Sequence, residues 1–406
     1  MTSNWEVVRL ADVAMINPPT SKLTPESPFI TMSDVDEWGR WASTSGAKGS
    51  RGGIRAEGGD VLVARITPCL ENGKIAMVPR DLGAVGGSTE FIVLRGGEKS
   101  LSEFLFLWAS ESGTHASAIN LMVGSTGRQR VSASDFAALP MSLPSIAEQR
   151  RIVDLIGALD EAIEAAQQVA DECAQSWASA ILSELSLVDS DPVKAESMFR
   201  HVIGGSWGSP PSEEDTRVQA IGPSSYAGSR IDVDLTLSTE RSLSAKRAKV
   251  RSLEPGDIVL ERSGGSPTQP VGRVIRMSST ETNVVPSDFM RLLRPDPEVV
   301  DSALAFWIMW ALYRSDASLP YQKFTTGIRN LNIPDYLSGV SVRIPRVAGE
   351  QVRIVEMAES FLEAHEAAKG HTESLRALRS EMLTSLLSGS HTIPDSYDAL
   401  LKAVDA

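Results

Sequence analysis

The spacing of apolar residues changes twice along the chain, near residues 145 and 346, from short runs to a long regular repeat. In both regular segments apolar or small residues recur in alternating steps of four and three, which is the spacing of one helix face in a coiled coil. No proline interrupts either segment, and Gly157 and Gly370 are their weak points. The pattern predicts two long helices, over 145–188 and 346–390. The repeating positions are 152, 156, 159, 163, 166, 170, 173, 177 and 180, then 354, 358, 361, 365, 368, 372, 375, 382 and 386.

Several of these positions hold small residues, which would let two helices approach closely. We therefore expect the two helices to pair as an antiparallel coiled coil. About 35 helical residues would span roughly 50 Å, enough to hold the flanking segments a fixed distance apart. The alternative is that each helix is amphipathic and only covers its own domain.

The segments that precede the helices carry short apolar runs of mixed character. Two of these runs open with a Gly-Asp turn, and they are separated from the others by turn residues, which is typical of strands. Residues 101–112 and 302–314 have the apolar face of a helix. Each segment is therefore predicted to be a mixed α/β module, and the chain as a whole belongs to the α+β class. The predicted strands are 61–64, 75–78, 91–94, 258–260 and 291–293.

The second half of the chain repeats the first at an offset of about 200 residues. Each copy is long enough to bury its own core, so the repeat predicts two similar domains rather than a solenoid. The matched pairs are Gly59-Asp60 with Gly256-Asp257, Gly73-Lys74-Ile75 with Gly272-Arg273-Val274, Glu90-Phe91 with Asp288-Phe289, Thr126-Gly127 with Thr326-Gly327, and Asp135-Phe136 with Asp335-Tyr336.

The repeat and the helical pattern together divide the chain into five parts. The first module covers 1–144 and its helix 145–188. The second module covers 189–345 and its helix 346–390, and a tail follows over 391–406. The stretch between Asp189 and Asp215 is rich in Ser, Gly and Pro, which suits a passage from helix to module.

Composition indicates a folded globular protein. The chain has 406 residues, and 42% of them are hydrophobic. It has no run of about 18 apolar residues and no basic-then-apolar start, so we expect a cytoplasmic protein. Its two cysteines, Cys69 and Cys173, cannot build a disulfide framework.

The net charge of −13 argues against a nucleic-acid partner, but the distribution of the charge does not. Segments 145–191 and 346–406 together carry 8 basic and 20 acidic side chains, which accounts for −12 of the total. The modules are close to neutral, so basic patches that face a phosphate backbone are compatible with the sequence. An ordinary solvated surface explains the charge of the modules equally well.

Leu143-Pro144 followed by Glu148-Gln149-Arg150-Arg151-Ile152-Val153 closes the first module, and Ile344-Pro345 followed by Glu350-Gln351-Val352-Arg353-Ile354-Val355 closes the second. These phrases resemble those that close the modules of the specificity subunits of Type I restriction–modification systems. The order of module, helix, module and helix is also similar to that family, and the resemblance covers essentially the whole chain. The other phrases that carry it are Ile16-Asn17-Pro18, the loops 124–131 and 321–327, the stretch 256–265, and Leu386-Leu387-Ser388-Gly389.

The resemblance implies a non-catalytic DNA reader. Each module would be a target recognition domain that reads one half of a bipartite, asymmetric double-stranded DNA sequence. The paired helices would set the unread spacer and dock two modification (methyltransferase) subunits, which bind S-adenosylmethionine and methylate adenine. Two restriction subunits, which use ATP and Mg²⁺, can join such complexes. This chain itself would hold no cofactor and no metal.

Candidate DNA contacts lie in two glycine-containing loops and beside the Gly-Asp strands. Arg and Gln can pair with guanine and adenine edges, while Ser, Thr and Lys suit phosphates. For any single residue a solvent-exposed structural role is an equally good interpretation. The loop candidates are Arg128, Gln129, Arg130, Gln322, Lys323, Thr325, Thr326 and Arg329, and the strand candidates are Arg65, Lys74, Arg262 and Arg273.

Catalytic motifs are weak. Asn17-Pro18-Pro19 is similar to the start of an Asn-Pro-Pro-aromatic methyl-transfer motif, but Thr20 offers no ring to stack on a flipped base. There is no G-x-G-x-x-G loop for a methyl donor, no P-loop, and no metal-ligand spacing among the five histidines. Glu148 and Glu350 stand at helix starts, where capping is the expected role.

Two hypotheses follow for the function. The first is a DNA specificity subunit, whose modules read different half-sequences because their middle portions diverge. The second is a stand-alone enzyme or regulator that uses two DNA-reading modules for another purpose. The first hypothesis predicts no methyl transfer by the purified chain until a modification subunit is added.

Overall fold

The computed structural model describes residues 5–44, 46, 52–125, 127–226, 230–265, 269–325 and 328–399. The chain forms two compact units. Unit 1 consists of Met1–Ala166 and His371–Ala406, and unit 2 consists of Gln167–Gly370. The five-part division expected from the sequence stays a prediction.

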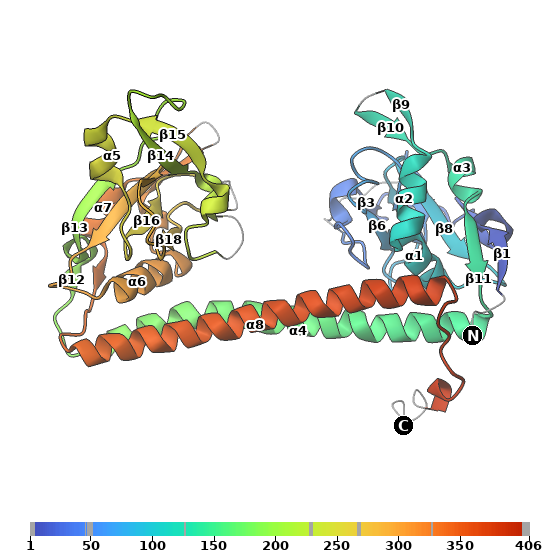
Figure 1. Ribbon diagram of the computed structural model, residues 1–406. Helices are drawn as coiled ribbons and strands as arrows, with labels where there is room; N and C mark the ends of the chain where they lie inside the picture. Colours follow the sequence, from blue (N-terminus) through green and yellow to red (C-terminus); the bar gives the residue numbers. More distant parts are fainter. Residues whose placement is uncertain are drawn as a thin grey trace. The chain divides into compact units, whose positions relative to one another are not determined.

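Unit 1 is a mixed α/β body (Figure 1). Its main sheet has the order β2-β8-β5-β6 and is antiparallel. The elements are β1 Glu6–Arg9, β2 Ala14–Ile16, β3 Phe29–Ile30, β4 Ile54–Ala56, β5 Val61–Ala64, β6 Ile75–Met77, β7 Val85–Gly87, β8 Phe91–Gly96, α1 Ser102–Ser110, α2 Ser112–Asn120, β9 Val123–Ser125, β10 Arg128–Arg130, α3 Ala133–Ala137 and β11 Pro140–Leu143, with α4 beginning at Ile146.

The apolar run of β5 is continuous because both faces of the sheet are covered. Val61 and Val63 pack with α1, whereas Leu62 and Ala64 belong to a second cluster on the opposite face. The helix predicted over 101–112 is shorter than expected. Glu111 adopts an extended backbone, and its carboxylate accepts the N–H of Thr114 at 2.9 Å, so it ends α1 and caps α2.

Unit 2 repeats this plan. Its main sheet has the order β13-β20-β16-β18, and each pairing matches one in unit 1. The elements are β12 Val193–Lys194, β13 Phe199–Gly204, β14 Thr216–Ile221, β15 Thr239–Leu243, α5 Ala245–Arg251, β16 Ile258–Glu261, β17 Ser263–Gly264, β18 Val274–Arg276, β19 Val284–Pro286, β20 Met290–Pro295, α6 Ser302–Arg314, β21 Gln322–Thr325, β22 Ile328–Leu331, α7 Ile333–Gly339 and β23 Ser341–Val342.

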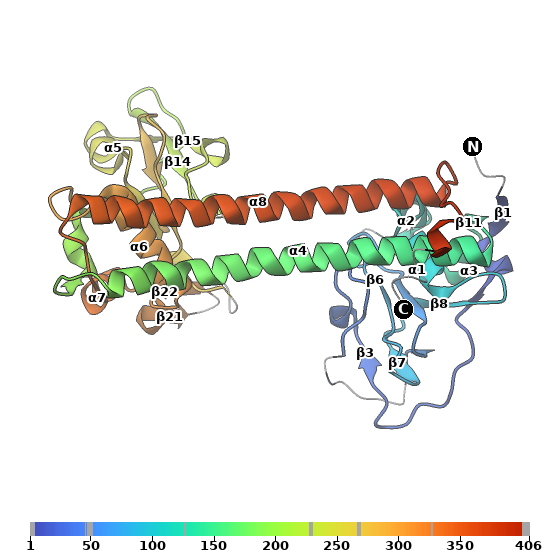
Figure 2. The ribbon, with the colours of Figure 1, turned by 90° about the horizontal axis from the view of Figure 1, so that it is seen from below.

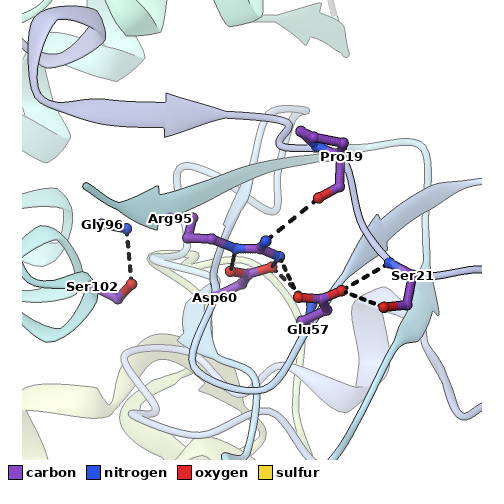
Figure 3. Close-up of polar contacts among 7 residues, drawn as sticks. All are labelled: Pro19, Ser21, Glu57, Asp60, Arg95, Gly96 and Ser102. Carbon is purple, nitrogen blue, oxygen red and sulfur yellow. Dashed lines mark hydrogen bonds and ion pairs between the residues drawn. The ribbon is translucent and has the colours of Figure 1, made fainter. Parts of the chain in front are cut away.

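The Gly-Asp turn of unit 1 is the centre of a buried ion pair (Figure 3). Gly59 has a φ of +90°, which a residue with a side chain rarely adopts. Asp60 then accepts the N–H of Glu57 at 2.8 Å and two bonds from Arg95, at 2.6 and 2.7 Å. Glu57 also pairs with Arg95 at 3.2 Å and accepts two hydrogen bonds from Ser21. The turn therefore ties β5 to β8 through side chains as well as through the ladder.

Unit 2 contains the same ion pair at the same place. Gly256 again has a φ of +90°, and Asp257 accepts the N–H of Glu254 at 2.7 Å. Arg294 donates two bonds to Asp257, at 2.8 and 2.7 Å, and lies 2.7 Å from Glu254. This agreement of atoms confirms that the two modules are structural copies.

Ladder register corrects one sequence match by one residue. Val63 pairs with Ile92 in unit 1, and Leu260 pairs with Arg291 in unit 2. Phe91 is therefore equivalent to Met290, and the sequence match of Phe91 with Phe289 was wrong. A one-residue slip exchanges the two faces of a strand. Accordingly Phe91 and Met290 are buried, whereas Phe289 is 48% exposed.

In each Glu-Gln phrase, the glutamine side chain makes hydrogen bonds to the backbone of the module. Gln149 is fully buried, accepts the N–H of Leu101 at 2.9 Å and donates to the carbonyls of Lys99 and Pro144. In unit 2, Gln351 accepts the N–H of Asp301 at 2.7 Å and donates to Pro345. Each glutamine thus joins the start of a long helix to the loop before the module's apolar helix, which refines the expected capping role.

We expect Gln149→Leu to destabilise unit 1 by about 2 kcal/mol, because it removes the partner of one part-buried N–H and of two carbonyls, one of them buried. Urea unfolding of the full chain measures the change. Gln168→Leu is the matched control, since Gln168 lies on the exposed surface of α4 and bonds only to Glu172. Equal loss in both variants would contradict the role assigned to Gln149.

Two long helices cross the boundary between the units, α4 over Ile146–Ser186 and α8 over Ala348–Leu387. They have 41 and 40 residues and lie within the ranges 145–188 and 346–390 predicted for them. Within unit 1 they pair through Asp160 and Arg379, which form an ion pair. Leu383 and Leu386 share the core of α1 with Ile152 and Ile156.

Within unit 2 the same helices run side by side (Figure 2). His365 Nδ1 lies 3.1 Å from the carbonyl oxygen of Ala170, and Arg353 pairs with Glu184 at 2.8 Å. Partner numbers rise on one helix as they fall on the other, so the helices are antiparallel, as predicted. Ala170 is the kind of small residue that such a close approach requires.

The tail after α8 folds back onto the start of α4 within unit 1. Ile393 is 7% exposed and joins the core of that unit. Asp398 accepts two bonds from Arg151, at 2.7 and 2.8 Å, and Asp395 lies 2.6 Å from the same guanidinium. The carboxylate of Glu148 accepts the N–H of Ile393 at 3.3 Å. The tail is therefore part of the folded unit as far as residue 399.

Candidate nucleic-acid interface

In unit 1 the loop predicted to bind DNA is a hairpin of β9 and β10, called here the first hairpin. Arg128 pairs with Ser125, and Gln129 pairs with Gly124. Gly124 has a φ of +145°, and a Cβ there would lie 2.5 Å from the carbonyl oxygen of Arg128. The glycine therefore allows the two strands to approach closely. Arg128 is exposed and bonds to none of the described residues.

The base of the first hairpin is fixed to β5. Arg130 donates to both carboxylate oxygens of Glu90 at 2.7 to 3.1 Å, and these bonds lower the pKa of Glu90. The N–H of Thr67 donates to the carbonyl of Gln129, and that of Val131 to the carbonyl of Arg65. The structure thus brings Arg65, Arg130 and Gln129 together as the support for Arg128.

Two predicted contacts face the protein interior instead. Lys74 Nζ donates to the carbonyls of Met32 and Val35 at 2.8 and 2.9 Å. Its equivalent, Arg273, donates to Glu261 at 2.6 and 2.9 Å. Burial opposes the charge of Arg273, but the bonds to Glu261 leave its pKa raised. The role of these cations in DNA binding stays a prediction, and the structure shows them holding loops and strands in place.

In unit 2 the equivalent hairpin consists of β21 and β22, called here the second hairpin. Lys323 pairs with Asn330 and Phe324 with Arg329, so the two pairs lie on opposite faces. The Arg329 guanidinium lies 5.7 Å from the Phe324 ring centroid. Thr325 belongs to β21, and Thr326 lies outside the described residues.

The two hairpins differ in chemistry although their anchoring is the same. The N–H of Leu331 donates to the carbonyl of Arg262, as that of Val131 does to Arg65. This register makes Phe324 equivalent to Gly124 and Ile328 equivalent to Arg128. Phe324 and Ile328 are 55% and 46% exposed. The first hairpin therefore presents a cation where the second presents apolar side chains.

Gln322 and Arg262 have different surroundings. Gln322 donates to the carbonyl of Val271 at 2.8 Å and to Ser318, and it accepts the N–H of Val271, so its amide is engaged inside unit 2. Arg262 is exposed and lines a cavity of about 650 Å³ together with Lys323. The structure thus unites these two predicted cations at the base of the second hairpin.

Sequence reasoning missed two residues of this surface. Arg291 lines the same cavity, and Phe324 stands exposed on the second hairpin. A signal for Arg291 was available, because unit 1 has Ile92 at the equivalent strand position and a charge rarely replaces a buried apolar residue without a reason. Phe324 gave no signal, since a single aromatic residue is normally part of a core.

The weak methyl-transfer motif has a structural explanation. Asn17 has a φ of +48°, its N–H donates to the carbonyl of Val93 at 2.7 Å, and its side-chain oxygen accepts the N–H of Val93 at 2.9 Å. The amide therefore holds the end of β2 against β8. Over the described ranges, no group of His, Cys, Asp and Glu side chains is placed to hold a metal ion. No helix in the described part of the chain is long and apolar enough to span a membrane.

Comparison with known proteins finds the same family as the sequence resemblance. Residues 2–172 match the family model described as the Type I restriction modification DNA specificity domain. The Type I restriction enzyme EcoEI specificity subunit of Escherichia coli is 28% identical over 169 residues. The EcoAI specificity subunit of the same organism is 29% identical over 166 residues. Each match covers 38% of this chain and 27% of the relative, so the chain spans about a quarter of the length of these curated relatives.

A solved structure on complex assembly and conformational transition of the type I R-M system contains a chain of similar fold. The TM-score is 0.63 at 21% sequence identity, over 95% of this chain and 98% of that chain. This likeness shows a shared fold that includes both units. Residues 2–172 are thus similar to a Type I restriction modification DNA specificity domain.

Proposed function

We propose that this protein is the DNA specificity subunit of a Type I restriction–modification complex and reads a bipartite, asymmetric target. The observation that carries the proposal is the pair of equivalent hairpins with unlike surfaces. A duplicated frame provides two DNA-reading positions, and the exchange of Arg128 for Ile328 gives each position its own chemistry. Two different half-sequences follow from two different surfaces.

The proposal assigns no chemistry to this chain. Two modification subunits that bind S-adenosylmethionine would dock on it and methylate adenine, and restriction subunits that use ATP and Mg²⁺ would be optional partners. The complex would act in the cytoplasm, where it meets double-stranded DNA. The proposal is supported by the matched specificity domain and by the internal hydrogen bonds of Asn17, the first residue of the partial methyl-transfer motif.

Single-molecule sequencing of host DNA with and without this gene tests the proposal. We expect deletion to abolish adenine methylation at one bipartite motif and to leave other motifs unchanged. The purified chain should transfer no methyl group until a modification subunit is added. Methyl transfer by the chain alone, or an unchanged methylome while a modification subunit is expressed, would contradict the proposal.

Arg128→Ala should weaken binding of the complex to its target by about 2 kcal/mol, or roughly 30-fold, if Arg128 reads a base edge. Selectivity should relax in one half-site only. Binding to duplexes with each position varied measures both effects. Arg9→Ala is the control, since Arg9 is exposed on β1 and pairs with Asp12. Relaxed selectivity in both halves would contradict independent reading by the two units.

A further inference from the structure

The cavity beside the second hairpin concentrates positive charge from three separate segments of unit 2. Arg262 follows β16, Arg291 lies within β20, and Lys323 lies within β21. The cavity has a volume of about 650 Å³. Its wall contains a single carboxylate, that of the exposed Glu196, so the wall has an excess of positive charge. We call it the cation cavity.

Arg291 is the half-buried member of the three, and it has no carboxylate partner among the described residues. Its Nη1 donates only to the carbonyl of Met290, at 3.0 Å. The guanidinium lies against Gly204, its partner residue across the ladder. Asp288 is the acid that acts on it electrostatically, but a carboxylate oxygen of Asp288 already accepts the N–H of Trp207 at 3.0 Å.

The surroundings of Arg291 disfavour its charged form. Burial lowers the pKa of Arg291, the nearby Arg262 lowers it further, and Asp288 opposes both. All other described arginines with a shifted pKa have it raised, as in Arg95, where hydrogen bonds to Asp60 are the main cause. A half-buried guanidinium that donates to no carboxylate is stabilised by an anion that enters the cavity.

Lys323 and Arg262 lack internal partners as well. Neither side chain bonds to a described residue, and both are exposed. Asn330, which faces Lys323 across the hairpin, is occupied by a hydrogen bond from Ser263 at 2.6 Å. The three cations are therefore free to act on a ligand in the cavity, while the neighbouring amide keeps the hairpin in place.

Unit 1 lacks this arrangement. The residue equivalent to Arg291 is Ile92, which is buried in the core, and the residue equivalent to Lys323 is Val123, which is exposed. Only Arg65 remains, as the counterpart of Arg262. Two of the three charges thus belong to unit 2 alone, although the strands that carry them belong to the shared frame.

We propose that the cation cavity seats one phosphate of the DNA backbone in the half-site bound by unit 2, with Arg291 as its inner ligand and Arg262 and Lys323 at the rim. The inference rests on the proposed function and adds a phosphate contact that unit 1 does not make. A phosphodiester supplies the single negative charge and the two free oxygens that a guanidinium binds well. The seat positions the duplex, while the hairpin reads it.

The test uses the full chain with its modification subunits and a duplex that carries the methylated motif of the host. Arg291→Gln should weaken binding about 10-fold at low salt, and the slope of log K against log salt should fall by about 0.9, the value for one phosphate. Selectivity for bases should not change. Arg346→Gln removes an exposed cation elsewhere in unit 2, near Asp191, and should change neither quantity.

A second measurement replaces single phosphates by uncharged methylphosphonates along the unit 2 half-site. In the wild-type complex, the methylphosphonate at one position should lower the affinity for the duplex. In the Arg291→Gln complex, the methylphosphonate at that position should cause no further loss of affinity. Lys323→Gln should reduce the same sensitivity, and it keeps the test valid if Arg291→Gln fails to fold, because Lys323 is exposed. If the methylphosphonate at that position lowers the affinity of both variants as much as that of the wild type, the proposed phosphate site is wrong.

Other outcomes separate the inference from the function on which it rests. If the wild-type complex binds the motif with normal selectivity but Arg291→Gln keeps the full salt slope, the phosphate seat is wrong and the proposed function stands. Altered base preference in Arg291→Gln would also overturn it, since Arg291 would then contact a base edge. If the wild-type complex does not prefer the motif at all, the proposed function itself fails.

Discussion

Asp60→Asn should destabilise unit 1 by about 3 kcal/mol, because it removes the charge that neutralises a partly buried arginine. The Asp60 side chain is 2% exposed and that of Arg95 is 23% exposed, so water can replace the lost carboxylate only in part. One carboxylate oxygen also accepts the N–H of Glu57, which holds the turn. Loss of the pair therefore loosens both the turn and the link between β5 and β8.

Hydrogen exchange of the full chain locates the effect as well as its size. Protection should fall in β5 and β8 for Asp60→Asn, and in β16 and β20 for Asp257→Asn, whose carboxylate has the equivalent partners Arg294 and the N–H of Glu254. Asp81→Asn is the matched control, since Asp81 is exposed and bonds to no described residue. Loss of protection in unit 2 for Asp60→Asn, or in unit 1 for Asp257→Asn, would contradict the assigned roles. A change as small as that of Asp81→Asn would also contradict them.

A double substitution measures the interaction itself. Arg95→Met should destabilise the chain alone, yet it should cost less in the background of Asp60→Asn, because the charge it removes no longer has its main partner. Additive effects would mean that Asp60 acts only by closing the turn. The same cycle with Arg294→Met and Asp257→Asn provides an independent repeat in unit 2.

The repeat, five strands of the two main sheets (β5, β6, β8, β16 and β20) and the long helices could be predicted from the sequence because their signals are local and periodic. Gly59-Asp60 marks a turn wherever it occurs before an apolar run, and nine spaced positions mark a helix face. Arg95 could not be assigned, because its partner lies 35 positions away and only the sheet brings them together. For the same reason the match of Glu90 with Asp288 failed by one residue, since register depends on the ladder.

The candidate site was predictable as two loops but not residue by residue. Arginine and lysine look alike in a sequence whether they face DNA or the interior. Lys74 points inward because two backbone carbonyls accept its hydrogen bonds there. Arg273 points inward because the carboxylate of Glu261 accepts its hydrogen bonds. Arg128 and Lys323 stay outside because nothing within the described residues accepts their bonds. This difference depends on neighbours that are distant in the chain.

The hairpins show how a duplicated frame can carry two different surfaces. Gly124 is needed in the first hairpin because a Cβ would meet the backbone of Arg128, whereas the second accommodates Phe324 at the equivalent place. The two surfaces therefore differ in backbone as well as in side chains. An exchange of specificity between units should require transfer of a whole hairpin, and single substitutions should weaken a surface rather than convert it.

Truncation after Ser390 is the second large effect expected. It removes Ile393 from the core of unit 1, which alone should cost about 2 kcal/mol. It also deprives Arg151 of the carboxylates of Asp395 and Asp398 in a largely buried position. The free energy of unfolding should therefore fall by more than the contribution of Ile393 alone. Hydrogen-exchange protection should also drop in the first turns of α4.

Truncation after Ala399 is the matched control, because it keeps Ile393 and both carboxylates. We expect its unfolding midpoint to equal that of the complete chain. Arg353, the counterpart of Arg151 in unit 2, pairs with Glu184 on α4 instead of a tail, so protection in unit 2 should be unchanged by either truncation. If both truncations unfold at the same urea concentration, the tail contributes nothing to unit 1, and the contacts of Arg151 are not a source of stability.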